Sequence, residues 1–580
     1  MCDIAVMGNR IAGNLAAAYL TRYHPQAKVA IIGPKGEGLP SVGESTVECT
    51  VMFMKDIGIF DWLNETQAPK GGLTFYYKLD PSSWDESYWA LETPVTLNAV
   101  SKQLNRPVLD QFLRERNEER GVAYIPGKVS QVELGTGSEP HRLEVRDEDG
   151  PREITARYLI DATGRSRVLG RKLDLVLRPT QNQRSTFWFR LANFDRSLWM
   201  RDVKVTKAEH NLYDSYYCTH HFMGPGNWIW CIPLQSNEYD ELISIGITWR
   251  PDLFKRDIRS VEDLLNYLDK QHPSLAAIVR SGTVVDTATY RDYLYACKQV
   301  YGERWYIIGD AARAVDPLYS TGLVFTTLQI RQVSQLIRLE HDRKLTASEL
   351  KAFNDFIISA QETLQGEVTR HYDIMHDPMQ SHIRVQWDTN EYEHFHLPLL
   401  ARGFHLWPAG VRFLLRNRAI CADSGESLVP YAEPNRIWRL RQRLLAAAAH
   451  AIGPARAANM IDNYKHVLNY KFDGSDSDRL SRMLAHGFMI RSYLRLRLLH
   501  RAHWAGAVEQ AGPLLKDACL ALLLLLTGER LLPMIQPITI DTRENLKADP
   551  DPASEPAPTA VVTTLSGGSA RHHLRRVTHE

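Results

Sequence analysis

Short apolar runs separated by a glycine turn open the chain. Residues 2–7 form one such run, residues 11–23 have helical composition, and residues 28–32 form a second run. Short runs bounded by turns are typical of buried strands, whereas the longer segment between them is typical of a helix. This order of strand, helix and strand predicts the start of a parallel sheet in an α/β fold.

After Val42 the pattern changes to short apolar runs alternating with polar turns. These runs predict strands at residues 142–145 and 158–161, and in the aromatic-rich segments near 186–191 and 216–248. We interpret this middle section as a β-rich substrate-binding layer.

Helical periodicity dominates from Gly309 onward, because apolar residues recur there at spacings of three and four. The predicted helices cover residues 323–339, 347–364, 436–452 and 480–503. Beyond about residue 541 the composition turns to Asp, Pro, Ala, Thr and Ser without periodicity, which predicts a disordered tail.

Composition and charge exclude several classes of protein. The 69 basic and 68 acidic residues nearly cancel, so nothing points to nucleic acid. The seven cysteines are far apart and form no CxxC pair, which favours a reducing, cytoplasmic compartment. The first residues do not resemble a signal peptide, and the most apolar stretch, 518–526, is too short to span a membrane, so we expect neither export nor insertion.

The first turn, Gly8-Asn-Arg-Ile-Ala-Gly13, is a damaged form of the dinucleotide fingerprint G-x-G-x-x-G. In that fingerprint the glycines let the backbone approach a pyrophosphate at a helix N-terminus. Arg10 replaces the second glycine, and Gly33 stands where a ribose-binding carboxylate is expected. The turn alone could equally be a strand-to-helix corner of another α/β protein.

Two later segments resemble flavoproteins of the glutathione reductase and hydroxylase type. The first is an apolar strand that ends in Asp161 and a turn at Gly164. The second, Gly309-Asp310-Ala followed by Pro317 to Gly322, is similar to the second FAD signature of that superfamily. The resemblance implies that Asp310 binds ribitol hydroxyls and that the following helix directs its N-terminus at the flavin pyrimidine.

Over roughly residues 1–400 the chain resembles the flavin-dependent, or tryptophan, halogenase family. Four segments carry this resemblance: Val42-Gly-Glu-Ser-Thr46, which is similar to the strap over the flavin; Ala68-Pro-Lys70-Gly-Gly72; Trp228-Ile-Trp230-Cys-Ile-Pro233; and Leu318-Tyr-Ser-Thr-Gly322. The implied fold is an FAD-binding Rossmann-like α/β domain with an inserted β-rich layer and a helical C-terminal region. We expect a core over residues 1–340, a helical region over 341–540 and the tail over 541–580.

The resemblance implies that Lys70 is catalytic and guides hypohalous acid to the substrate, by hydrogen bond or as a chloramine. An ammonium group can donate a proton to hypohalite, and desolvation can lower its pKa toward neutrality. The alternative is a solvated surface lysine that follows a proline.

Trp228 and Trp230 are implied to lie beside the flavin and to discourage its direct attack on an organic substrate. Alternating tryptophans also describe an ordinary half-buried strand. Tyr319 replaces the glutamate of tryptophan halogenases, so free tryptophan has no matching carboxylate to receive its ring proton. We therefore expect a phenol, a pyrrole or a carrier-tethered aromatic substrate.

The remaining site residues are implied to bind FAD. They are Gly8, Ile11, Ala12, Gly13, Val42, Gly43, Glu44, Ser45, Arg106, Asp310, Pro317, Ser320, Thr321, Gly322 and Leu323. For Arg106 the alternative is a solvated residue at a helix start. His220 and His221 are adjacent and point to opposite faces of a strand, so we assign no metal.

The implied reaction is oxidative tailoring in secondary metabolism. A separate flavin reductase supplies reduced FAD, oxygen forms the C4a-hydroperoxide, halide is oxidised, and Lys70 delivers the halogen to an electron-rich aromatic ring. One alternative is a flavin-dependent monooxygenase on the same fold. Another is a non-catalytic scaffold. The sequence does not decide whether the protein forms a homodimer. The losses at Arg10 and Gly33 suggest weakly held flavin.

Overall fold

A computed structural model gives the fold of the chain. The chain divides into two compact units, Met1–Gly528 and Glu529–Glu580. The structure describes residues 2–35, 42–79, 86–93, 101–201, 203–207, 215–376 and 403–417, together with the single positions Ser381, Val385, Tyr392 and Leu400, all of them in the first unit. The predicted helices at 436–452 and 480–503, the apolar stretch at 518–526 and the tail lie outside these residues.

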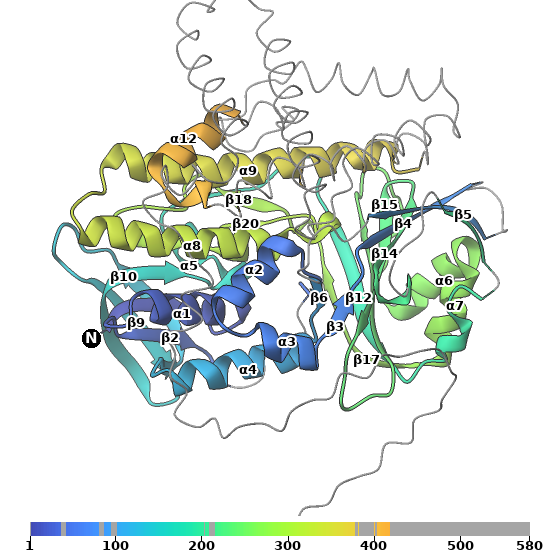
Figure 1. The fold of residues 1–580 in the computed structure, drawn as a ribbon, viewed down its shortest axis with the longest axis horizontal. Helices are drawn as coiled ribbons and strands as arrows, with labels where there is room; N and C mark the ends of the chain where they lie inside the picture. The colour runs from blue at the N-terminus through green and yellow to red at the C-terminus, as the bar shows by residue number, and fades with distance from the viewer. Residues whose placement is uncertain are drawn as a thin grey trace, which may run out of the picture. The chain divides into compact units, whose positions relative to one another are not determined.

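A seven-stranded, largely parallel sheet forms around the N-terminal strand. Its order is β7 (Ala123–Pro126), β2 (Val29–Gly33), β1 (Cys2–Met7), β10 (Gly150–Asp161), β9 (His141–Asp147) and β8 (Lys128–Glu133), with β19 (Trp305–Ile307) paired to β10. β1 pairs in parallel with β2 and with β10, so the predicted parallel sheet is confirmed. Helices α1 (Ile11–Tyr23), α4 (Arg106–Glu119) and α8 (Gly322–His341) accompany this sheet (Figure 1).

The aromatic-rich segments predicted for the β-rich layer form an eight-stranded mixed sheet, whereas the strands predicted at 142–145 and 158–161 belong to the seven-stranded sheet, within β9 and β10. The order of the eight-stranded sheet is β13 (Lys204–Lys207), β5 (Ser87–Thr93), β4 (Leu73–Lys78), β14 (Thr219–Gly224), β15 (Asn227–Leu234), β16 (Leu242–Trp249), β12 (Ser185–Ala192) and β17 (Thr283–Tyr290). Small ladders join β3 (Ala68–Lys70) to β6 (Ser101–Gln103), and β18 (Tyr295–Cys297) to β11 (Val176–Leu177) and β20 (Arg313–Ala314).

The central strands β14, β15 and β16 of the eight-stranded sheet are buried on both faces. Ile229 and Cys231 of β15 belong to one apolar cluster, to which α6 (Val261–Gln271) and α7 (Pro273–Ser281) contribute. Trp228 and Trp230 belong to the cluster on the other face. Successive strand residues face opposite sides, so the interpretation of β15 as half-buried is wrong.

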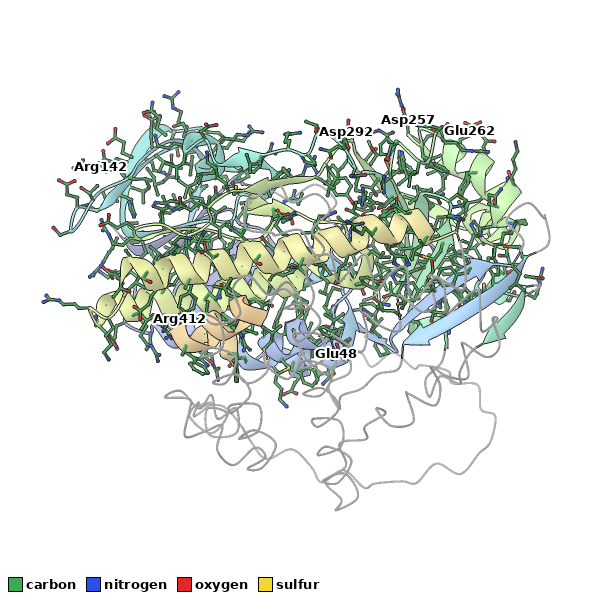
Figure 2. The ribbon with its side chains drawn as sticks, turned by 90° about the horizontal axis from the view of Figure 1, so that it is seen from above. Glu48, Arg142, Asp257, Glu262, Asp292 and Arg412 are labelled. Carbon is green, nitrogen blue, oxygen red and sulfur yellow. The ribbon has the colours of Figure 1, made fainter. Side chains whose placement is uncertain are left out.

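Helix α9 (Ala347–Ile374) joins the two sheets. Toward its start, Asn354 accepts the backbone N–H groups of Val300 and Tyr301 next to the parallel sheet. Toward its end, Val368 and Tyr372 pack with the tryptophans of β15. α9 lies beside α8 (Figure 1) and extends from the side that carries Arg142 toward the side that carries Glu262 (Figure 2).

The shorter described helices are α2 (Glu48–Asp56), α3 (Phe60–Thr66), α5 (Val168–Lys172) and α12 (Pro408–Asn417). Among the described helices, none is both long and apolar enough to cross a membrane. α12 packs on α9. The proposed boundaries at residues 340 and 540 stay a prediction.

Candidate active site

The turn between β1 and α1 depends on two glycines. Gly8 has φ of +110°, and a Cβ there would lie 2.3 Å from the carbonyl oxygen of Ala162. A Cβ on Gly13 would lie 1.8 Å from the carbonyl oxygen of Gly8. Arg10, which replaces the middle glycine, is exposed and makes no side-chain cap of α1. The fingerprint has therefore lost a glycine only where the backbone tolerates a side chain.

The absent carboxylate at Gly33 also has a structural reason. A Cβ on Gly33 would lie 2.4 Å from the side chain of Asn9, whose amide donates a 2.8 Å hydrogen bond to the carbonyl of Pro34. Asn9 thus occupies the space that a side chain at position 33 would need. This exclusion could not be read from the sequence.

Asp161 has a structural role in the neighbouring turn. Its buried carboxylate accepts hydrogen bonds from the backbone N–H groups of Thr163 (2.9 Å) and Leu169 (2.7 Å). Its neighbour Ala162 supplies the carbonyl that approaches Gly8. The strand that ends in Asp161 therefore builds one wall of the turn at the start of α1.

Asp310 lies where the three flavoprotein-like segments meet. A Cβ on Gly309 would lie 3.3 Å from the Cβ of Ala12 on α1, and the N–H of Gly309 donates to Gln329 of α8 (2.9 Å). The Asp310 side chain is exposed, yet the surrounding protein raises the pKa of its carboxyl by desolvation, and the charges of Arg106 and Arg165 oppose this effect. The Asp310 carboxylate is therefore accessible to solvent although protein atoms surround it.

The turn before α8 is strained. Tyr319 and Ser320 have φ of +71° and +59°, in the left-handed region that non-glycine residues rarely adopt. The backbone N–H of Leu318 donates to Asp316 (3.1 Å), which supports the turn. The hydroxyl oxygen of Thr321 is buried without a hydrogen-bond partner in the described chain, next to the helix start at Gly322.

These features fit a dinucleotide cofactor. Within the described chain, neither α1 nor α8 has a side-chain cap or an acidic residue in its first turn, so both N-termini are suited to electronegative groups. The exposed carboxylate of Asp310 lies between the turns that lead into them. Ile11, Pro317 and Leu323, which were predicted to bind FAD, lie in or beside these turns: Ile11 begins α1, Pro317 precedes the turn before α8, and Leu323 is in the first turn of α8.

Lys70 is fully enclosed, so the alternative of a solvated surface lysine is wrong. It lies at the end of β3 with 1% of its surface exposed, and its ammonium donates a 2.6 Å hydrogen bond to the carbonyl oxygen of Thr46. Burial lowers the pKa of Lys70 to about 8, although the charges of Glu48 and Cys218 act in the opposite direction. Both protonation states are therefore accessible near neutral pH.

The segment from Val42 to Thr46 is fixed from two sides. The guanidinium of Arg106 donates to the carbonyl of Val42 (2.6 Å) and pairs with Asp110 (3.2 Å), so the solvated alternative for Arg106 is also wrong. Ser45 and Thr219 share a 2.8 Å hydrogen bond between their hydroxyls. Gly43 has φ of +95°, which permits the close approach to Arg106.

Glu44 is a buried acid within this segment. Its Oε2 atom has no hydrogen-bond partner in the described part of the chain, and 2% of the residue is exposed. Burial raises the pKa of Glu44 to about 7, although a hydrogen bond from Ser244 and the charges of Arg190 and Arg106 lower it. A neutral carboxyl can thus exist here near pH 7.

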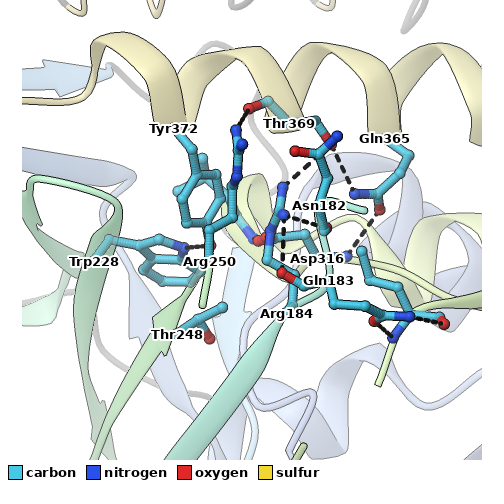
Figure 3. A network of polar contacts seen from close by, with 12 residues as sticks. Asn182, Gln183, Arg184, Trp228, Thr248, Arg250, Asp316, Gln365, Thr369 and Tyr372 are labelled. Carbon is cyan, nitrogen blue, oxygen red and sulfur yellow. Dashed lines mark hydrogen bonds and ion pairs between the residues drawn. The ribbon is translucent and has the colours of Figure 1, made fainter. Parts of the chain in front are cut away.

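Trp228 and Trp230 both make structural hydrogen bonds. The Trp228 indole donates to the hydroxyl of Tyr372 (2.8 Å), and the Trp230 indole donates to Ser244 (3.2 Å). A Cβ on Gly246 would lie 2.2 Å from the Trp230 ring, so only glycine fits beside it. Figure 3 shows Trp228 and Tyr372 beside Arg184 and Asp316.

Tyr319 contacts a histidine that no sequence motif indicated. Its hydroxyl lies 3.0 Å from Nδ1 of His371 on α9, and its ring meets Phe75 edge-on at 5.9 Å. Phe75 stacks on His221 at 4.6 Å. We call His221, Phe75, Tyr319 and His371 the aromatic row. His371 carried no signal in the sequence, because it lies on a helix without a recognisable motif.

The two adjacent histidines do point to opposite faces. His220 contacts Tyr76 (3.2 Å), whereas His221 stacks on Phe75. In the described ranges no three His, Cys, Asp or Glu side chains gather as a metal site would require.

Comparisons with known proteins identify the family of the chain and its fold. A family model described as tryptophan halogenase matches residues 3–99 and 85–378. The chain is 27% identical over 445 residues to the flavin-dependent halogenase chlA of Dictyostelium discoideum, covering 70% of this chain and 72% of that protein. It is 26% identical over 342 residues to a 1H-pyrrole-2-carbonyl-(peptidyl-carrier protein) chlorinase of Pseudomonas fluorescens, covering 55% and 72%.

Solved structures show the same fold. The crystal structure of halogenase PltM has a TM-score of 0.62 at 19% identity, covering 79% of this chain and 94% of that chain. The flavin-dependent brominase Bmp2 has a TM-score of 0.54 at 18% identity, covering 77% and 99%.

Fold and site together define an FAD-dependent oxidoreductase. The chain belongs to the tryptophan halogenase family. The predicted fold class, cofactor and family are therefore confirmed.

Proposed function

We propose that this halogenase oxidises chloride or bromide and transfers the halogen through Lys70 to an electron-rich phenol or pyrrole. The observation that carries the proposal is the buried ammonium of Lys70, held by Thr46 in the segment that Arg106 fixes. A lysine enclosed in this way, with its pKa lowered to about 8, is suited to proton donation near neutral pH.

The cofactor site uses residues from three parts of the chain. The N-terminus of α1 would hold the FAD pyrophosphate, Asp310 the ribitol, and the N-terminus of α8 the flavin ring. Bound in its reduced form, FAD would supply the oxygen activation that converts halide into hypohalous acid. Val42 to Ser45 and Arg106 would close over it.

Lys70 would then act on hypohalous acid in one of two ways. Its ammonium can donate a hydrogen bond to the oxygen, which makes the halogen more electrophilic. Its neutral amine can instead form an N–halogen bond as the O–halogen bond breaks and water leaves. The aromatic cluster around Trp228 excludes water and preserves the electrophile.

The substrate and partners are further parts of the proposal. Relatives named as pyrrolyl-carrier-protein chlorinase and brominase support a pyrrole, free or tethered to a carrier protein. A phenol fits the same chemistry. We propose that a separate flavin reductase supplies reduced FAD in the cytoplasm, because the sequence contains no second nucleotide fingerprint.

The test is a coupled turnover assay. Purified protein, FAD, a flavin reductase, NADH, oxygen and bromide are incubated with free phenols and pyrroles and with a carrier-tethered pyrrole, and products are identified by mass. Lys70→Met should reduce bromination by at least about 100-fold, the scale of a lost proton donor. Lys102→Met changes a buried lysine on the neighbouring strand and should leave bromination close to the wild-type rate.

Three other outcomes would contradict the proposal. If Lys70→Met still brominates at close to the wild-type rate, Lys70 is not catalytic. Oxygenated product that forms without halide indicates a monooxygenase. Bound FAD with neither product, in every substrate class, favours a non-catalytic scaffold.

A further inference from the structure

Replacement of ring hydrogen by halogen releases one proton for each halogen introduced. A site that carries out this reaction therefore benefits from a proton acceptor near the ring. Among the histidines of the described chain, His220 and His221 belong to β14, and His371 contacts Tyr319 from α9.

Neither histidine of β14 is suited to accept the proton. Nδ1 of His221 lies 3.2 Å from the carbonyl oxygen of Thr74, so this nitrogen carries the hydrogen. Burial, together with the charge of Lys70, lowers the pKa of His221 to about 3. His220 lies on the opposite face, between Tyr76 and the carbonyl of Tyr216.

His371 is placed differently. It is completely buried on α9, and its Nδ1 lies 3.0 Å from the hydroxyl of Tyr319. A tyrosine hydroxyl can donate to a neutral imidazole nitrogen and simultaneously accept through its oxygen. Glu367 is also buried and lies one turn earlier on α9, on the same helix face.

Tyr319 is half-buried and held in an unusual conformation. Its φ of +71° lies in the left-handed region, and such strain persists only where the surroundings impose it. The turn is imposed by Asp316, which binds the N–H of Leu318, and by the start of α8. This conformation directs the Tyr319 ring toward Phe75 and His371.

Phe75 connects this pair with the Lys70 end of the site. It stacks on His221, whose pKa responds to the charge of Lys70, and it meets Tyr319 edge-on. The aromatic row therefore extends from the neighbourhood of the proton donor Lys70 to a potential proton acceptor.

We propose that Tyr319 and His371 form a relay that removes the ring proton during halogenation; this rests on the proposed function. The ring carbon bonds to the halogen as the O–halogen bond of hypohalous acid breaks, and the oxygen leaves as water with a proton from Lys70. The C–H electron pair returns to the ring. Its proton passes to the Tyr319 oxygen while the Tyr319 proton moves to Nδ1 of His371.

The test separates halide oxidation from ring substitution. Phenol or pyrrole, whichever the wild-type enzyme brominates faster, is supplied with and without ring deuterium. Hypobromous acid is measured separately with a free trap in the absence of substrate. Tyr319→Phe removes the relay hydroxyl. His371→Asn keeps a group that can hydrogen-bond Tyr319 but removes the basic nitrogen.

Both variants should form hypobromous acid at close to the wild-type rate and brominate the ring at least about tenfold more slowly. A primary isotope effect on ring substitution should appear in both, because C–H cleavage becomes slow. A purely structural role for His371 predicts wild-type behaviour for His371→Asn. Tyr301→Phe is the matched control, because it removes another buried tyrosine hydroxyl, which donates to Gln332 (2.9 Å).

Two outcomes overturn the relay. If Tyr319→Phe and His371→Asn both brominate at the wild-type rate and show no isotope effect, the relay is wrong, whereas the proposed function still holds. A wild-type enzyme that forms no hypobromous acid removes both the proposed function and the relay.

Discussion

Arg184 and Asp316 form a 2.7 Å ion pair in which neither side chain is exposed. Arg184 also donates to the hydroxyl of Thr369 (3.2 Å), and its guanidinium lies 4.1 Å above the ring of Tyr372 (Figure 3). Asp316 supports the turn that carries Tyr319. One buried pair thus connects the residue before β12, the turn before α8 and the end of α9.

Removing one partner of this pair should be costly. Asp316→Asn leaves the Arg184 charge buried without its counter-charge, which typically costs about 3 to 5 kcal/mol. Urea unfolding measures this loss. Asp269→Asn breaks the exposed pair with Arg280 and should cost no more than about 1 kcal/mol. An Asp316→Asn protein as stable as the control would show that the pair does not hold the turn.

The burial of Lys70 should make stability depend on pH. Its pKa falls from 10.5 to about 8 on folding, so its contribution to stability is present above the unfolded pKa and is lost as pH falls through about 8. The wild type should gain about 3 kcal/mol relative to Lys70→Met between about pH 8 and about pH 10.5. Lys298→Met, at an exposed position, should show no such trend in the same unfolding series.

The burial of Glu44 should make stability depend on pH in the opposite direction. Its pKa rises from 4.5 to about 7 on folding, so its contribution is present below about pH 4.5 and is lost as pH rises through about 7. Glu44→Gln mimics the neutral acid and should gain about 3 kcal/mol over the wild type across this interval. Glu262→Gln, at an exposed position of α6 (Figure 2), is the control. Parallel pH profiles for wild type and Glu44→Gln would contradict a neutral Glu44.

The tight turn at Gly8 should control FAD binding. Gly8→Ala places a methyl group against the carbonyl of Ala162 at a φ that alanine avoids, which should cost about 2 to 5 kcal/mol and weaken FAD affinity. Gly137→Ala also has positive φ but meets no atom within 4 Å, so it should cost about 1 kcal/mol and leave FAD affinity unchanged. Flavin fluorescence titration and thermal unfolding measure both. Equal affinities in the two variants would place the cofactor elsewhere.

The sequence predicted those elements whose cause is local. β1 and α1 follow from an apolar run, a glycine turn and a helical segment, and all three are adjacent in the chain. The fingerprint could be recognised although Arg10 replaces its middle glycine. Position 10 is exposed and accepts a side chain, whereas a side chain at Gly8 or Gly13 would clash with the backbone.

Features that depend on residues far apart in the chain could not be predicted from the sequence. The prediction for α9 ended at residue 364, but the helix continues to Ile374, because its polar residues Thr369 and His371 have partners distant in the sequence, Arg184 and Tyr319. The ion pair of Arg184 with Asp316 joins residues 132 positions apart. The burial of β15 on both faces requires α6, α7 and α9, which no local alternation reveals.

The fate of the oxygen atom tests the proposed halogenation most directly. The purified protein is supplied with FAD, a flavin reductase, NADH, bromide and ¹⁸O₂, together with an electron-rich phenol or pyrrole, and the product mass is measured. Halogenation through hypobromous acid predicts a product that contains bromine and no ¹⁸O, because the oxygen leaves as water. A product that contains ¹⁸O and no bromine would contradict halogenation and identify an oxygenase.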